Sequence, residues 1–255
     1  MGRAKTILVI SDMQVPYHSA QAVDNLIEFT ASFKPDVLVN VGDDVDSPQP
    51  SQWSKGMAGE YAGDLQKHMD MVAEIHGRFR SAIGTAPYHV SRSNHGDRVQ
   101  KYIARYAPAL TGLRALQLPA LAGYDAHGIE YHTQPFTIAP GWVCCHGDEG
   151  PSSAIPGRTA GLLADRWGVS VVCGHTHSAG ISPTSRGFGG QVSTVWGCEV
   201  GHIMDMEKAT YLAAGHANWQ QSFGLLYQVG ARVTPVLVPI HKGGVFEVEG
   251  VTYGT

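Results

Sequence analysis

The sequence predicts an α/β protein in which strands and helices alternate at first and short strands dominate later. Apolar runs rich in Val and Ile recur between segments whose apolar residues are spaced three and four apart, the patterns of buried strands and amphipathic helices. After residue 177 the chain changes to short β-prone runs separated by glycines. These later runs predict antiparallel hairpins that complete a second sheet.

The expected elements follow from these patterns in chain order. The first strands are predicted at residues 7–10, 37–41, 88–91, 142–145 and 169–173. Helices are predicted at 24–33, 60–83, 99–106 and 158–167. Segments 130–139 and 142–146 flank Pro140-Gly141, which indicates a hairpin. Later strands are predicted at 189–200, 223–229, 232–240 and 245–251.

Two segments lack a clear period. Residues 47–59 are rich in Pro, Ser, Gln and Gly, and we expect a loop beside the functional site. Residues 107–128 fit either an inserted cap or a simple connection. With either alternative, the length and composition predict a single domain over 1–255.

Short polar clusters stand where the predicted strands end. They are Asp12-Met13-Gln14, Gly42-Asp43-Asp44-Val45-Asp46, Asn94-His95, His146-Gly147-Asp148 and Gly174-His175-Thr176-His177. One Asp at a strand end is often only a turn former or a helix cap. Ligands, however, collect beyond the carboxyl ends of strands in α/β sheets, so the repeated placement predicts one shared site.

The side chains in these clusters are metal ligands by type. Carboxylate, amide oxygen and imidazole together suit Mn, Fe, Zn or Ni better than Ca or Mg alone. His175 and His177 are two residues apart in an extended segment and therefore point the same way. The set is too large for one tetrahedral ion, and a pair of ions about 3.5 to 4 Å apart would share it.

The clusters resemble the motifs of the calcineurin-like metallophosphoesterases, which read D-x-H, G-D-x-x-D, G-N-H-D/E, a lone His before a small residue, and G-H-x-H. The second, fourth and fifth motifs match here as Gly42-Asp43-x-x-Asp46, His146-Gly147 and Gly174-His175-x-His177. The third keeps Asn94-His95 between Ser93 and Gly96, and the first has Gln14 in place of His. The opening Asp-x-Gln-x-Pro is similar to a branch often found in phages. The resemblance implies a four-layered αββα sandwich of two mixed sheets flanked by helices.

The resemblance also implies two groups of ligands. One ion would be held by Asp12, Asp43 and His177, with Gln14 in the place of the usual His. The other would be held by Asn94, His146 and His175, with Asp43 bridging both ions.

His95 would then protonate the leaving oxygen or stabilise its charge, and Asp46 would orient its imidazole. Arg98 is either a further phosphate contact, because its planar fork suits that anion, or a surface residue paired with Asp97. Gln14 is either a weak ligand or a hydrogen-bond donor to metal-bound water, and His18 is a third candidate for that position.

Composition limits the classes of partner. The chain has 255 residues and 18 basic against 22 acidic side chains, so it shows no basic footprint for extended nucleic-acid binding. The basic runs within 78–80 and 98–105 are interpreted as solvated helix faces. No segment reads as a membrane span or a signal peptide, which predicts a cytoplasmic protein, in the host cytoplasm if it is phage-encoded. The four cysteines lack CxxC spacing and are expected to be reduced core residues.

The predicted function is hydrolysis of a phosphodiester in a nucleotide, a cyclic nucleotide or a nucleic-acid end, by hydroxide activated at a pair of divalent ions. Mn is the preferred metal, with Fe, Ni, Zn or Mg as alternatives. A phosphomonoesterase with the same centre is the first alternative. A binding module that has lost its chemistry is the second, suggested by Gln14, Ser93 and Gly96. The oligomeric state is not predicted.

Overall fold

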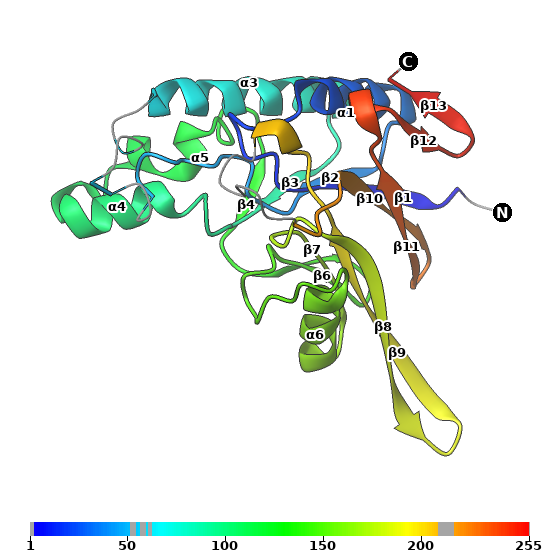
Figure 1. The fold of residues 1–255 in the computed structure, drawn as a ribbon. Coiled ribbons are helices and arrows are strands. Elements are labelled where there is room, and N and C mark those ends of the chain that lie inside the picture. The colour runs from blue at the N-terminus through cyan, green and yellow to red at the C-terminus, as the bar shows by residue number, and fades with distance from the viewer. Residues whose placement is uncertain (1–2, 52–54, 57–59, 61–62, 209–216, 255) are drawn as a thin grey trace.

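Two packed sheets with helices outside them form the protein. The computed structural model describes residues 3–51, 55–56, 60, 63–208 and 217–254. Figure 1 shows α1 (Ala20–Phe33) and α3 (Leu65–Ile83) above one sheet and α6 (Arg158–Trp167) below the other. The predicted αββα sandwich is confirmed.

The first sheet is mixed and carries its parallel strands in its middle and on one side. Its order is β11-β10-β1-β2-β3-β4. The parallel part is β1 (Lys5–Ile10), β2 (Val37–Asn40), β3 (Tyr88–Ser91) and β4 (Glu130–His132). The antiparallel part is β10 (Ser222–Val229), which pairs with β1, and β11 (Arg232–Pro239).

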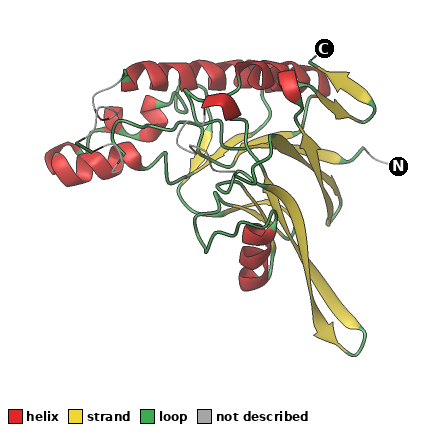
Figure 2. Ribbon diagram, viewed as in Figure 1, coloured by secondary structure: helices red, strands yellow, loops and turns green. Residues whose placement is uncertain are grey.

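The second sheet has the order β5-β6-β7-β9-β8. Its parallel centre is β6 (Trp142–Cys144), β7 (Ser170–Cys173) and β9 (Gln191–Val200). The antiparallel edges are β5 (Phe136–Ala139) and β8 (Ala179–Phe188). The β8–β9 hairpin extends beyond the body of the molecule (Figure 2).

The alternation of apolar residues along β1 explains why the first sheet is buried on both of its faces. Leu8 and Ile10 pack into the core beneath the helices, whereas Ile7 and Val9 pack into the core between the sheets. Alternate side chains of a strand point to opposite faces, so an unbroken apolar run fits a strand buried on both sides. A third core lies between α6 and the second sheet and includes Leu163.

Helix ends account for the differences from the predicted helices. α1 starts at residue 20 rather than 24, because the Ser19 hydroxyl caps the backbone N–H of Ala22. α3 starts at residue 65 rather than 60, with Asp64 as its N-cap. α4 (Arg98–Tyr106) and α6 agree with the prediction to within one residue.

Several predicted strands were wrong in extent or placement. Segment 130–139 is two strands in different sheets, β4 and β5, so only β5 and β6 form the predicted hairpin. β8 was missed because it is polar and largely exposed. The β10–β11 hairpin joins the first sheet, not the second, and segment 245–251 divides into β12 (Phe246–Val248) and β13 (Val251–Tyr253), which pair only with each other.

Residues 107–128 contain short helical turns. These are η1 (Pro108–Leu110), η2 (Arg114–Leu116) and α5 (Leu118–Leu121). The segment also supplies Tyr124, which is fully buried under α3. Whether it acts as a cap stays a prediction, as does the single-domain assignment. None of the helices within the described residues is long and apolar enough to cross a membrane. All four cysteines are free and buried.

Candidate metal centre

The polar loops at the strand ends have an unusual backbone. Five of the candidate side chains sit on residues with positive φ: Asp12, Gln14, Asp43, His175 and His177. Residues other than glycine rarely adopt this conformation, which costs on the order of 1–3 kcal/mol and tends to occur at functional sites. The backbone is therefore strained at five of the residues that the sequence analysis predicts to be metal ligands.

Backbone hydrogen bonds hold the first two loops side by side. The N–H of Asp12 donates to the carbonyl oxygen of Gly42 at 3.0 Å, and the N–H of Gln14 donates to that of Asp43 at 2.8 Å. Because β1 and β2 are parallel neighbours, their carboxyl ends lie at one edge of the sheet. The pairing continues past the strands and brings the two acidic loops together.

Asp43 is the point where the clusters meet. Its Oδ2 lies 3.0 Å from Nε2 of Gln14 and 3.3 Å from Nε2 of His146. Its Oδ1 accepts a hydrogen bond from the backbone N–H of His95 at 3.1 Å. The carboxylate is buried and faces two groups of potential ligands at once.

The first group contains Asp12, Gln14 and His177. Nε2 of His177 lies 3.1 Å from Oδ1 of Asp12 and 3.4 Å from Nε2 of Gln14. Oδ2 of Asp12 accepts from the N–H of His175 at 3.0 Å and from the hydroxyl of Ser11. Gln14 turns its amide nitrogen toward Asp43, so its oxygen would face that position only after a half-turn of the amide.

The second group contains Asn94, His146 and His175. Nδ1 of His146 donates to the carbonyl oxygen of Val41 at 2.9 Å, so Nε2 is the nitrogen that would bind an ion once its own proton is displaced. That Nε2 lies 2.8 Å from Oδ1 of Asn94. Asp43, His146 and His175 each present a ligand atom within 4.8 Å of the others.

The electrostatics favour a cation. Burial disfavours charge on His146, but Asp43 outweighs it and raises the pKa of the imidazole to about 10. Burial would likewise raise the pKa of Asp43, yet His146 and His95 hold it well below its usual range. The carboxylates thus stay ionised and attract positive charge, which a metal ion would supply in place of protons.

Buried polar atoms without a hydrogen-bond partner also indicate that this site binds a cation. Among the described residues, Oε1 of Gln14 and Nδ1 of His175 are buried and have no hydrogen-bond partner. Such atoms are costly unless an ion or water satisfies them. The donor set, its burial and its charge all fit divalent metal ions.

His95 lies beside this centre and is held from two sides. Its Nδ1 is 2.8 Å from Oδ1 of Asp46, and its Nε2 is 3.0 Å from Nη2 of Arg98. Burial disfavours the imidazolium, but Asp43 and Asp46 outweigh it and raise the pKa of His95. Arg98 also donates to the backbone carbonyl of Asp46 at 2.6 Å. It therefore faces the centre, while Asp97 pairs with Arg92 and Lys101.

Two aromatic neighbours of the centre, His202 and Trp219, are not among the predicted ligands. The rings of His202 and Trp219 lie 5.2 Å and 4.3 Å from that of His177. Burial lowers the pKa of His202 to about 3, so it is neutral. Both residues come from segments far along the chain, and no local motif marks them. His18, the third candidate for the position of Gln14, pairs through its backbone with Met204 in an isolated antiparallel β-bridge.

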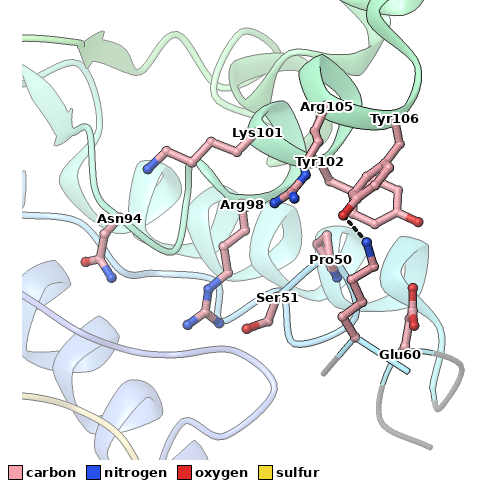
Figure 3. A pocket seen from close by; sticks show the side chains of 10 residues that line it. Pro50, Ser51, Glu60, Asn94, Arg98, Lys101, Tyr102, Arg105 and Tyr106 are labelled. Atoms are coloured by element: carbon pink, nitrogen blue, oxygen red, sulfur yellow. Dashed lines mark hydrogen bonds between the residues drawn. The ribbon is translucent and has the colours of Figure 1, made fainter. Parts of the chain in front are cut away.

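A hollow of about 440 Å³ adjoins the centre (Figure 3). Asn94 and Arg98 lie toward one end of it, and α4 lines it with Lys101, Tyr102, Arg105 and Tyr106. Lys55 adds a further cation and donates to the hydroxyl of Tyr106, and Glu60 is the acidic residue of the lining. Lys101 and Arg105 are exposed to solvent, as predicted for this helix face, and they also line the hollow.

These layers and the strand-end cluster define a four-layered α/β protein with a candidate metal centre. No protein-family model matches the chain. Over 250 residues it is 36% identical to the Gene 54 protein of Mycobacterium phage D29, spanning 97% of this chain and 98% of the relative. The Gene 54 protein of Mycobacterium phage L5 gives the same identity and coverage. The chain belongs to the family of these phage Gene 54 proteins.

Solved structures show a more distant likeness. Vacuolar Protein Sorting 29 from Cryptosporidium parvum aligns over all of both chains with a TM-score of 0.49 and 15% identity. A predicted phosphoesterase from Streptococcus pneumoniae aligns over 94% of this chain and 91% of its own, with a TM-score of 0.40 and 11% identity. Both scores are below 0.5, so neither supports a conclusion about activity.

Proposed function

We propose that this chain is a metal-dependent phosphodiesterase with a dinuclear centre. The observation that carries the proposal is the position of Asp43, whose carboxylate lies 3.0 Å from Gln14 and 3.3 Å from His146 and so faces both ligand groups. One carboxylate with two oxygens can bridge two ions. Asp12, Gln14 and His177 would hold one ion, and Asn94, His146 and His175 the other.

Two divalent ions bound there would lower the pKa of a water molecule and neutralise the charge of the phosphoryl group. The chain's own residues complete the chemistry. His95 stands beside the centre with a raised pKa and so keeps a proton that it would give to the leaving oxygen. Asp46, 2.8 Å away, orients the ring. Arg98 would contact a phosphoryl oxygen.

The hollow along α4 favours a phosphodiester substrate over a phosphomonoester. A monoester needs little beyond the centre, whereas the second substituent of a nucleotide diester must lie on the protein surface. Lys101 and Arg105 would bind a further phosphate there, and Tyr102 offers an aromatic face for a base. A nucleotide or the end of a nucleic-acid strand fits this lining.

Manganese is the metal we favour. Gln14 contributes a neutral amide where an imidazole would suit a late transition metal better, and oxygen-rich sites favour Mn and Mg. We also infer that the protein acts in the cytoplasm of the infected host, because its relatives are phage-encoded.

Hydrolysis of bis-p-nitrophenyl phosphate by chelator-treated protein, with Mn²⁺, Ni²⁺, Zn²⁺ or Mg²⁺ added back, tests the proposal. Asp43→Ala and Asn94→Ala should lose both metal and turnover, and His95→Ala should lose turnover alone. Lys101→Ala should raise KM for a dinucleotide. Arg78→Ala, which removes a cation on α3 that pairs with Asp24, should not.

Turnover of the p-nitrophenyl monoester alone would indicate a phosphomonoesterase. Two bound ions without any hydrolysis would indicate a binding module.

A further inference from the structure

A second group of ligand side chains lies on the first sheet, apart from the strand-end centre. It consists of His89 on β3 and of Glu130 and His132 on the edge strand β4. In the parallel register His89 is opposite Glu130, and Ser91 is opposite His132. Residues two apart share a face of a strand, so all three side chains project from the same face. We propose that they bind one divalent ion of the zinc type.

The distances are close to those within a single coordination shell, with each oxygen of Glu130 facing a different histidine. Nδ1 of His89 is 3.0 Å from Nε2 of His132 and 3.3 Å from Oε2 of Glu130. Nε2 of His132 is 3.6 Å from Oε1 of Glu130. Two ligand atoms bound to zinc at about 2.0–2.1 Å with tetrahedral angles lie about 3.3–3.4 Å apart. An ion between the three groups would therefore need only small movements.

Packing from the other sheet holds the imidazoles in place. The ring of His132 stacks on Phe136 of β5, with centroids 3.6 Å apart and planes 11° apart. The ring of His89 lies 5.6 Å from the same Phe136. His89 is also opposite Val39, which belongs to the core between the sheets. The cluster thus lies where edge strand β4 of one sheet approaches edge strand β5 of the other.

The lowered pKa values of His89 and His132 favour the neutral imidazoles that a metal ion binds. Burial lowers the pKa of both His89 and His132, although Glu130 acts in the opposite direction. Neutral imidazoles offer the lone pairs that a metal needs. Lys5 and Arg80 add positive charge near His89, and Glu130 supplies the negative charge that offsets it. Two imidazoles with one carboxylate form a donor set well known for Zn²⁺.

The ion would join β3 to β4. β4 has only 3 residues and forms the edge of its sheet, so it gains little from its own hydrogen bonds. A cross-link between neighbouring strands would stabilise that edge, and binding to the folded state alone raises the melting temperature by mass action. Zinc binding at this cluster needs no hydrolytic activity and is independent of the proposed function.

Zinc counting tests the site directly. The full chain is treated with chelator, titrated with Zn²⁺, freed of unbound metal and analysed by plasma mass spectrometry. We expect wild type to hold one more zinc per chain than His132→Ala, and Glu130→Gln to bind that zinc at least about tenfold more weakly. Because Glu130 is largely exposed, its variant tests the site even if His132→Ala fails to fold.

His241→Ala is the matched control, since His241 also pairs with a glutamate, Glu247, but has no second histidine in its group. It should keep the wild-type zinc count and the zinc-induced rise in melting temperature. An anomalous peak at the zinc edge between His89 and His132 would support the site. Equal zinc counts and affinities in wild type, His132→Ala and Glu130→Gln would overturn it.

Discussion

Asp44 points away from the candidate metal centre and lies 2.7 Å from Nε2 of His76, inside the core beneath the helices. Its Oδ2 also accepts from the hydroxyl of Tyr124. The other nitrogen of His76 is 2.6 Å from the hydroxyl of Tyr88. Asp43, the preceding residue, faces the metal ligands instead. One acidic pair therefore serves two purposes, because its members project to opposite sides of the loop.

Removing one member of this buried network should destabilise the fold. Tyr124→Phe would leave Asp44 with one donor fewer in a site without access to water, which costs about 1–3 kcal/mol. Urea unfolding should show a lower midpoint with an unchanged m-value. Tyr102→Phe, which removes an exposed hydroxyl, is the control and should leave the midpoint unchanged. An equal loss in both variants would mean that the network contributes little.

Gln14→His should tighten the first metal position without abolishing hydrolysis. The new imidazole would approach Asp43 and His177 from the position that the amide now occupies. Imidazole is the stronger ligand for late transition metals. Calorimetric titration with Ni²⁺ or Zn²⁺ should give a lower Kd than in wild type. If the affinities are equal, Gln14 does not lie within reach of the ion.

His95→Gln should lower kcat by about 10²–10⁴ on the diester, the usual contribution of a general acid. Its metal content should remain that of wild type, because the variant keeps the hydrogen bond from the backbone N–H of residue 95 to Asp43, and the His95 side chain lies 3.8 Å from that carboxylate, beyond hydrogen-bond distance. Asp46→Asn should cause a smaller loss, since it removes only the group that orients the ring. A His95→Gln protein that retains full kcat would contradict the assigned role.

Asp36→Asn should remove part of the dependence of folding stability on pH. The backbone N–H of Thr6 donates to Asp36 at 2.7 Å and lowers the pKa of that carboxyl, with help from the Thr6 hydroxyl and Arg3. A carboxyl with a lowered pKa in the fold stabilises above its unfolded value of 3.8, and this stability is lost as pH falls through the folded pKa.

At neutral pH the Asp36→Asn variant should therefore be less stable, by about 1 kcal/mol or less, because the carboxyl is partly exposed and screened by water. The difference should vanish once the pH is below the lowered pKa of the folded state, where the wild-type carboxyl is protonated as well. Thermal unfolding at several pH values measures this. A constant difference from acid to neutral pH would show that charge is not the cause.

The proximity of the candidate ligands could be predicted better than the order of the strands in the sheets. Its residues follow apolar strands in chain order, and parallel strands bring their carboxyl ends to one edge, so Asp12, Asp43 and Asn94 had to lie close together. The structure also links His146 and His177 to the same group. Local pattern and the resemblance were enough here, because each motif is short and contiguous.

Strand pairing was less predictable, because it depends on contacts between distant segments. Nothing local in 130–139 marks the point at which the chain leaves one sheet for the other, and β8 carries too few buried residues to show a strand pattern. The β10–β11 hairpin could have joined either sheet, and it joins the first because β10 pairs with the edge of β1.

The sequence by itself determined the α/β class and the polar clusters at the strand ends, including Gln14 in the first of them, since all of these are encoded in short runs of neighbouring residues. Only the tertiary structure decided which side chains meet from far apart. It brings Lys55 to the hollow that Lys101 and Arg105 line, and it sets His89 next to His132. Those contacts arise from the packing of whole layers, which no local period encodes.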